Sequence, residues 1–194
     1  MNDLHAEKND LRKLFAEKRT RIDRQTVEIK SSEILEHFFA LEQYKNSDSI
    51  HSFIGNLPGE VLTHELINRS LSEGKRIIVP IYKGNDAAPS HTELHDLDDL
   101  EQTAFGLLEP AENKITDAKA GDAELIVVPC LAVDRNGNRL GMGSGFYDKF
   151  LSTVDAVKVA LTFDFQFIDE LPSGEHDFKI DIVVTESGVT KIQK

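Results

Sequence analysis

The sequence predicts an α/β fold in which a mostly parallel sheet is flanked by helices. Two helical segments open the chain, and short apolar segments of strand length then alternate with helical ones. The strand candidates are continuous apolar runs, which is typical of strands buried on both faces of a parallel sheet. We therefore expect a three-layer, Rossmann-like arrangement with an N-terminal helical segment.

The first half of the chain contains both helical and strand patterns. Apolar residues recur at helical spacing in three segments, and two short apolar runs lie between or after them. Turn residues follow the first of these runs. We predict helices over residues 4–19, 24–39 and 60–73, and strands over residues 49–53 and 76–81.

The second half begins with a polar stretch, residues 83–120, for which we expect loops with one or two short strands. Buried strands and one more helix follow this stretch. We predict strands over residues 124–128, 158–163 and 181–185, and a helix over residues 145–153. Because no repeat, low-complexity tract or linker divides the sequence, we expect a single domain over residues 1–194.

The composition favours a globular protein that binds small molecules. The chain has 194 residues, enough to bury a sizeable core, and its net charge of −12 argues against nucleic acid or an acidic membrane as partner. The only cysteine, Cys130, excludes an internal disulfide and follows an apolar run, so we expect it to be half-buried. No apolar stretch approaches the roughly 20 residues that span a bilayer. We expect a cytoplasmic monomer.

One segment carries the clearest chemical pattern. Residues 133–148 read V-D-R-N-G-N-R-L-G-M-G-S-G-F-Y-D, with alternating glycines at 141, 143 and 145 between a predicted strand and a predicted helix. Such glycines let an oxygen-rich ligand approach backbone N–H groups, and the N-terminus of the next helix favours a phosphate. The segment matches neither a Walker loop nor a dinucleotide fingerprint. On local grounds a phosphate cradle and a structural turn both stay open.

The residues that flank the glycines favour the phosphate reading. Arg139 can hold a phosphate with a bidentate fork, and Asp148 can bind a hard cation such as magnesium. Phe146 and Tyr147 could line a flat ligand. Asp148 could also be a surface acid of the helix, and that alternative stays open.

The segment N-G-N-R-L-G-M-G-S-G-F-Y-D resembles the signature of 5-formyltetrahydrofolate cyclo-ligases, whose usual pattern is G-x-R-L-G-x-G-x-G-Y-Y-D. Three further segments resemble this family in the right order: K-N-D-L-R from Lys8, P-G-E ending at Glu60, and H-D-F-K-I-D-I-V-V-T-E from His176. The resemblance covers nearly the whole chain. The sequence departs from the usual pattern at Phe146, where tyrosine is commoner, and at Ser144, which puts the tuning of nucleotide affinity in doubt.

The resemblance implies an ATP-dependent enzyme that converts 5-formyltetrahydrofolate to 5,10-methenyltetrahydrofolate with release of ADP and phosphate. It implies Mg²⁺ as cofactor and ATP as co-substrate. Lys8, Arg12 and Arg139 would be the catalytic cations. The implied ATP-binding residues are Lys8, Asn9, Asp10, Leu11, Arg12, Arg139, Leu140, Gly141, Met142, Gly143, Ser144, Gly145, Phe146 and Tyr147. The implied folate-binding residues are Phe53, Glu60, Met142, Gly143, Ser144, Gly145, Phe146 and Tyr147, and the implied metal ligands are Asp148 and Asp181.

Several of these residues have a plainer reading. Lys8 and Arg12, at i and i+4, share one helix face, which is either a phosphate site or a solvated basic face. Glu60 could be an acid of a helix N-terminus, and Phe53 is more often a core residue. A relative that kept the fold but lost turnover is one alternative function. An α/β enzyme that handles a sugar phosphate or coenzyme A is the other.

Overall fold

A computed structural model describes residues 2–82, 90–104, 106–174 and 177–193. Within this part of the chain, the largest sheet has seven strands in the order β12-β11-β9-β6-β1-β2-β3. The strands are β1 (Ser49–His51), β2 (Arg76–Ile81), β3 (Ser90–Leu94), β6 (Leu125–Val128), β9 (Val157–Leu161), β11 (Ile182–Thr185) and β12 (Gly188–Lys191). The five inner strands are parallel, and only the edge strands β3 and β12 are antiparallel. The predicted mostly parallel sheet is confirmed.

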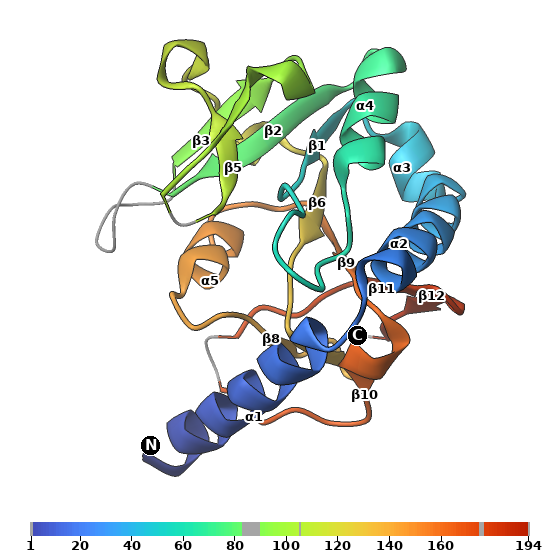
Figure 1. Cartoon of the computed structure of the whole chain (residues 1–194), viewed down its shortest axis with the longest axis vertical. Coiled ribbons are helices and arrows are strands. Elements are labelled where there is room, and N and C mark those ends of the chain that lie inside the picture. Colours follow the sequence, from blue (N-terminus) through green and yellow to red (C-terminus); the bar gives the residue numbers. More distant parts are fainter. Residues whose placement is uncertain (1, 83–89, 105, 175–176, 194) are drawn as a thin grey trace.

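Helices cover both faces of this sheet (Figure 1). On one face lie α2 (Arg24–Phe39), α3 (Glu42–Asn46) and α4 (His64–Ser72), and on the other lies α5 (Phe146–Leu151). Alternate residues of a strand serve the two faces: Ile77 packs in the cluster of α2 and α4, whereas Ile78 packs in the cluster of α5. Because both faces are buried, the strands are continuous apolar runs, as the sequence predicts.

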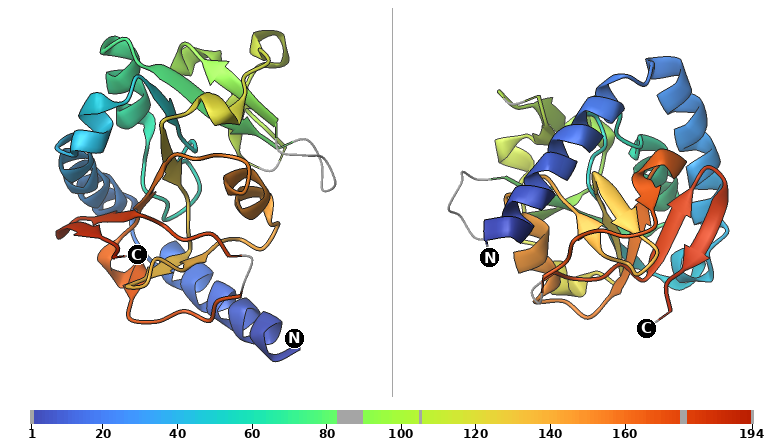
Figure 2. Two further views of the ribbon diagram at one scale, coloured as in Figure 1. Left: turned by 180° about the vertical axis from the view of Figure 1, so that it is seen from behind. Right: turned by 90° about the horizontal axis from the view of Figure 1, so that it is seen from below.

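The first helix, α1 (Asn2–Thr20), lies outside these three layers, along the bottom of Figure 1 and across the molecule in the view from below in Figure 2. It packs on a second sheet of β7 (Ala132–Asp134), β8 (Arg139–Leu140) and β10 (Phe167–Ile168). Phe15 of α1 shares a small apolar cluster with Leu140 and Leu171. The N-terminal helical segment is thus fixed against the chain that carries the glycines.

A third sheet and several short turns complete the described structure. β4 (Leu100–Gln102) and β5 (Leu108–Pro110) form an antiparallel pair, so the described part of residues 83–120 holds three strands rather than one or two. Single 3₁₀ turns lie at Leu97–Asp99, Glu112–Lys114, Ala120–Asp122 and Asp164–Gln166. No described helix has both the length and the apolar character needed to cross a membrane.

Two sequence predictions differ from the structure in ways that matter for the site. The helix predicted from residue 60 begins only at His64, because Leu62 and Thr63 form hydrogen bonds with Ser31 and Phe53 elsewhere in the chain. The glycines do not follow β6 directly. The antiparallel strands β7 and β8 lie between them, and strands this short depend on pairing that apolar periodicity does not reveal.

Candidate active site

A cavity of about 500 Å³ opens at the carboxyl ends of three inner strands. Its lining includes Phe53 and Ile54 after β1, Tyr82 after β2, and Cys130 after β6. One side is formed by α1 and another by the glycine segment 141–145. Ligands of open α/β sheets bind at this edge, where the strands end. The position therefore agrees with a binding site built on the main sheet.

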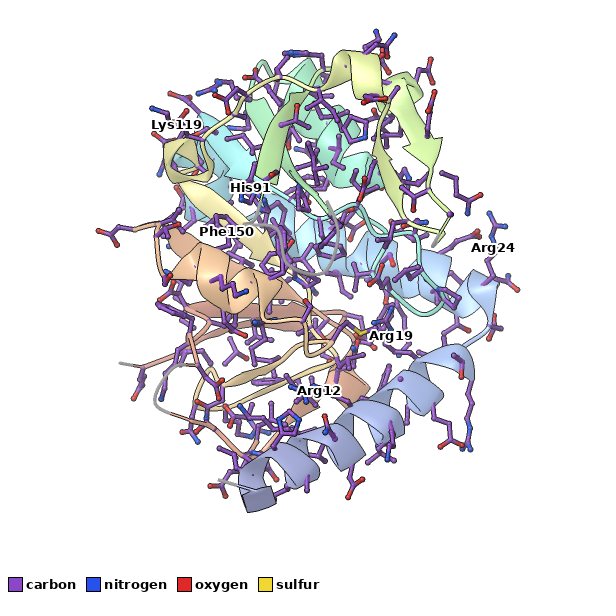
Figure 3. All side chains as sticks on the ribbon, turned by 90° about the vertical axis from the view of Figure 1, so that its left-hand side faces the viewer. Arg12, Arg19, Arg24, His91, Lys119 and Phe150 are labelled. Atoms are coloured by element: carbon purple, nitrogen blue, oxygen red, sulfur yellow. The ribbon has the colours of Figure 1, made fainter. Side chains whose placement is uncertain are left out.

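The inward face of α1 supplies most of the cations. Lys8, Arg12 and Arg19 line the cavity from positions four and seven residues apart, which places them on one side of the helix. Figure 3 shows Arg12 and Arg19 directed toward the body of the molecule, whereas Arg24, the first residue of α2, points outward. Lys8 and Arg12 are therefore part of a cavity wall rather than of a solvated helix face.

The glycine segment is shaped by its contact with arginines. Gly143 and Gly145 have φ values of +100° and +70°, a left-handed region that side chains other than glycine rarely adopt. A β carbon on Gly141 would lie 2.6 Å from Nη1 of Arg139, and one on Gly143 would lie 3.3 Å from Nε of Arg12. Gly143 and Gly145 thus suit the turn, and Gly141 and Gly143 leave room for the side chains of two arginines.

Three ion pairs organise the charges of the cavity. Lys8 forms an ion pair with Asp177. In the other two pairs, Arg19 Nη2 lies 3.3 Å from Glu60 Oε1, and Arg139 Nη2 lies 2.7 Å from Asp148 Oδ1. Arg12 instead donates from Nε to the carbonyl of Gly141 (3.0 Å) and from Nη1 to Asn9 Oδ1 (2.6 Å). Among the described residues, Arg12 has no carboxylate partner. It is the cation most available to an incoming anion.

Burial shifts the pKa of several groups of the wall, of which Asp177 and Cys130 bear on its chemistry. Burial raises the pKa of Asp177, but hydrogen bonds from Lys8 and from the N–H of Gly174 outweigh this effect, so the pKa is lowered overall. The group therefore stays an anion beside Lys8. Burial raises the pKa of the Cys130 thiol, which keeps it protonated and argues against a nucleophilic role.

The other end of the cavity is mostly apolar and carries the ion pair of Arg19 and Glu60. Phe53, Leu57 and Tyr82 line this end together with Glu60, which lies in the loop before α4. Phe53 packs in the hydrophobic core and also lines the cavity, so it can be a core residue and a ligand contact at the same time. Phe146 contacts Tyr82 with ring centroids 4.8 Å apart and an angle of 44° between the ring planes. This end can hold a flat ring with polar edges.

Four of the predicted site residues lie elsewhere. Asn9 supports Arg12, Asp10 faces solvent near Lys13, and Leu11 packs against the small apolar cluster under α1. Asp181 is not part of the cavity wall, and its Oδ2 accepts from the backbone N–H of Lys158. His176, quoted in the sequence motif, lies outside the described residues. The remaining predicted residues all line the cavity.

Sequence reasoning missed several wall residues, among them Arg19, Tyr82 and Asp177. Arg19 follows Arg12 by seven residues, so the helical period that pairs Lys8 with Arg12 also points to it. Tyr82 directly follows a predicted strand, where ligand contacts concentrate in this fold class. Asp177 lies in the motif that begins at His176, but its pairing with Lys8 joins distant parts of the chain and could not be read from that motif.

The residues present fit a magnesium ion that arrives with a phosphate ligand. In the described part of the chain, no three acidic, histidine or cysteine side chains gather as a ready metal cage. Mg²⁺, however, often takes one or two protein carboxylates and completes its shell with water and substrate phosphates. Asp148, whose side chain is 40% exposed, stands at the mouth of such a site.

Comparisons with known proteins decide the family. The model of the 5-formyltetrahydrofolate cyclo-ligase family matches residues 4–186. The chain belongs to this family. A cyclo-ligase of Mus musculus is 31% identical over 92% of this chain and 89% of its own length, and one of Mycolicibacterium smegmatis is 36% identical over 68% and 69%. The solution structure of the Aquifex aeolicus 5,10-methenyltetrahydrofolate synthetase superposes with a TM-score of 0.83 at 30% identity, covering 96% of this chain and 93% of that one.

The family assignment confirms the resemblance found in the sequence and the expected cyclo-ligase activity, the formation of methenyltetrahydrofolate from 5-formyltetrahydrofolate. It also removes the alternative of an enzyme for sugar phosphates or coenzyme A. A synthetase of Mycoplasma pneumoniae, 17% identical with a TM-score of 0.75 over 93% of this chain and 99% of its own, supports the fold alone.

Proposed function

We propose that the cavity binds 5-formyltetrahydrofolate and MgATP side by side and transfers one phosphoryl group from ATP to the formyl oxygen of the folate. The observation that carries this proposal is the division of the wall into two ends. Lys8, Arg12 and Arg139 gather at the glycine segment, and Glu60 lies among apolar side chains at the other end. A triphosphate and a pterin ring each have a chemically matched end of the same cavity.

The chemistry follows from the weakness of a formamide as an electrophile. The formyl oxygen attacks the γ-phosphorus, a new O–P bond forms, and the bond to the β-phosphate oxygen breaks as ADP leaves. N10 then attacks the formyl carbon, the C–O bond breaks, and phosphate leaves with closure of the ring and loss of the N10 proton. Lys8, Arg12 and Arg139 would neutralise the charge that develops on the transferring oxygens.

The protein supplies position and charge rather than covalent bonds. Arg12, which has no carboxylate partner in the described structure, would meet the phosphates first, with the N–H groups of residues 141–147 beside it. Asp148 would hold Mg²⁺, which when bound withdraws charge from the phosphate oxygens. Asp181 lies away from the cavity wall, so its predicted role as a second ligand is not part of this proposal. Glu60 would accept hydrogen bonds from the pterin N–H groups.

The test is a coupled measurement of product absorbance and phosphate release. With 5-formyltetrahydrofolate, ATP and Mg²⁺ present, we expect methenyltetrahydrofolate and phosphate to appear in equal amounts, and neither to appear when one component is left out. Absence of product with folded protein and bound ATP would support a relative that has lost turnover. Phosphate release without folate would contradict a shared site. We further propose that the protein is a monomer with a single domain and that it is located in the cytoplasm. A sedimentation experiment tests the monomeric state.

A further inference from the structure

The ion pair of Arg19 and Glu60 stands at the apolar end of the cavity, about two helical turns along α1 from Arg12. Both side chains are nearly buried, at 7% and 14% exposed. Arg19 Nη2 also donates to the carbonyl of Pro58 at 3.2 Å, and Glu60 Oε2 accepts from the N–H of Leu57 at 3.2 Å. These contacts hold the guanidinium and the carboxylate in a fixed relative position.

Both partners of the pair have unused hydrogen-bonding capacity. Nε of Arg19 is buried and has no acceptor, and Nη1 donates to no atom of the described residues. Each oxygen of Glu60 accepts one contact and keeps room for a second. A nearly buried guanidinium with unpaired N–H groups is unfavourable unless a ligand supplies the missing acceptor. Because both side chains line the cavity, the pair places a donor group and an acceptor group next to each other in its wall.

This arrangement matches one edge of the pterin ring. The pyrimidinone of 5-formyltetrahydrofolate carries two neighbouring donors, N3–H and the 2-amino group, and beside them one acceptor, the 4-oxo oxygen. A carboxylate accepts from the two donors, and a guanidinium next to it donates to the oxygen. We propose that Arg19 donates to the 4-oxo oxygen and so makes the site specific for 4-oxo pterins over their 4-amino counterparts. The proposal rests on the proposed function, because it requires the pterin at Glu60.

The expected discrimination is large because the 4-amino analogue reverses the pattern. Its amino group would place a donor against the donor of Arg19, and its N3 has no hydrogen for Glu60. A site built to hydrogen-bond a substrate group can reject an analogue without it by several powers of ten. We expect kcat/KM for 5-formyltetrahydrofolate to exceed that for its 4-amino counterpart by about 100-fold or more.

The experiment compares kcat/KM for these two substrates in the wild type, Arg19→Gln and Arg19→Lys. Arg21→Gln is the matched control, since Arg21 is an exposed arginine beside the end of α1 that pairs only with Glu17 among the described residues. For Arg19→Gln we expect a fall of about 100-fold with the 4-oxo substrate, a selectivity ratio within about 10-fold of one, and a KM for ATP within about threefold of wild type. Arg19→Lys should retain part of the selectivity, and Arg21→Gln should match the wild type.

Three results would distinguish a failure of the Arg19 proposal from a failure of the proposed function. Equal losses of activity with both substrates in Arg19→Gln, with the selectivity ratio unchanged, would make Arg19 purely structural and overturn the proposal. A wild-type ratio within threefold of one would also overturn it, whether or not the variants fold. If the wild type binds both pterins but cyclises neither, the proposed function fails instead, and the ratio of their dissociation constants in the wild type and Arg19→Lys then decides the role of Arg19.

Discussion

Acid should destabilise this protein through a buried histidine pair that the proposed reaction does not use. His51 of β1 is fully buried and His91 of β3 nearly so, with 3.1 Å between His51 Nε2 and His91 Nδ1. The ring of Phe150 in α5 lies 4.5 and 4.6 Å from the two imidazoles, and Figure 3 shows it beside His91. Tyr147 is the other titratable side chain that contacts His51. Within the described residues, no carboxylate contacts the pair to stabilise a positive charge.

The size of the effect follows from the lowered pKa values. Burial lowers the pKa of His91 to about 4, and burial together with the neighbouring His91 lowers the pKa of His51 well below its usual value. Between pH 6.5 and 4 the unfolded chain therefore binds more protons than the folded one, so stability falls as the pH falls through this range. The shift of His91 alone would lower the free energy of unfolding by about 2 kcal/mol between pH 8 and pH 5. Screening by solvent reduces this loss to about 1 to 2 kcal/mol.

Urea unfolding at pH 8, 6 and 5 measures this loss in the wild type, His91→Gln and His95→Gln. Glutamine keeps a polar partner for His51 but does not titrate, and His95 is a matched control because it is exposed near the same edge strand. Between pH 8 and pH 5, we expect the free energy of unfolding of His91→Gln to fall by about 1 to 2 kcal/mol less than that of the wild type. Groups that do not interact with His91 cancel in this difference. An equal pH slope in His91→Gln and wild type would refute the reasoning.

Three further substitutions test the phosphate end of the cavity, each by kcat/KM for ATP beside the free energy of unfolding. Arg12→Ala should lower kcat/KM by about 100-fold, whereas the exposed control Arg24→Ala should change it less than twofold; equal effects would remove Arg12 from the site. Gly143→Ala should cost about 1 to 2 kcal/mol of stability and at least tenfold in activity, because its β carbon meets Arg12. Gly74→Ala has similar strain and no atom within 4 Å, and it lies outside the cavity wall, so a matching loss of activity there would contradict a role for the Arg12 contact. Asp148→Asn should shift the magnesium dependence of the rate and lower kcat/KM about 100-fold for a stability loss of about 1 to 2 kcal/mol; an unchanged magnesium titration would make Asp148 only a partner of Arg139.

The sequence predicts those parts of the fold that depend on local patterns. Helix α2 has the predicted bounds, and strand β2 coincides with the predicted segment, because apolar spacing and length are local properties. The strands β7, β8 and β10 could not be found this way. They contain two or three residues each and exist only because β7 pairs with chain from two different parts of the sequence. These strands place Arg139, the first residue of β8, directly before the glycine segment.

The site was predictable in its residue types and not in its pairing. Glycine spacing and the period of α1 point to the residues of the proposed phosphate end, since both patterns are read along a short stretch of chain. The partner of Lys8 lies 169 residues away at Asp177, and the partner of Arg19 lies in the loop before α4. Such pairs are set by the tertiary fold. For the same reason Asp181, which lies in a motif that resembles the family ending, has its place at β11 and away from the cavity wall.

The pairing also bears on how a highly charged nucleotide can enter an acidic protein. Apart from His5, the cavity wall holds four basic and three acidic side chains, so it is only slightly positive within a chain of net charge −12. A triphosphate must therefore compete with Asp177 for Lys8 and with Asp148 for Arg139. Mg²⁺ would ease both exchanges, because it lowers the charge of the nucleotide and gives Asp148 a new partner as Arg139 turns to phosphate. If the cavity binds MgATP as proposed, Arg12 would set the first encounter, and the two exchanged pairs would give the site a preference for the magnesium complex over free ATP.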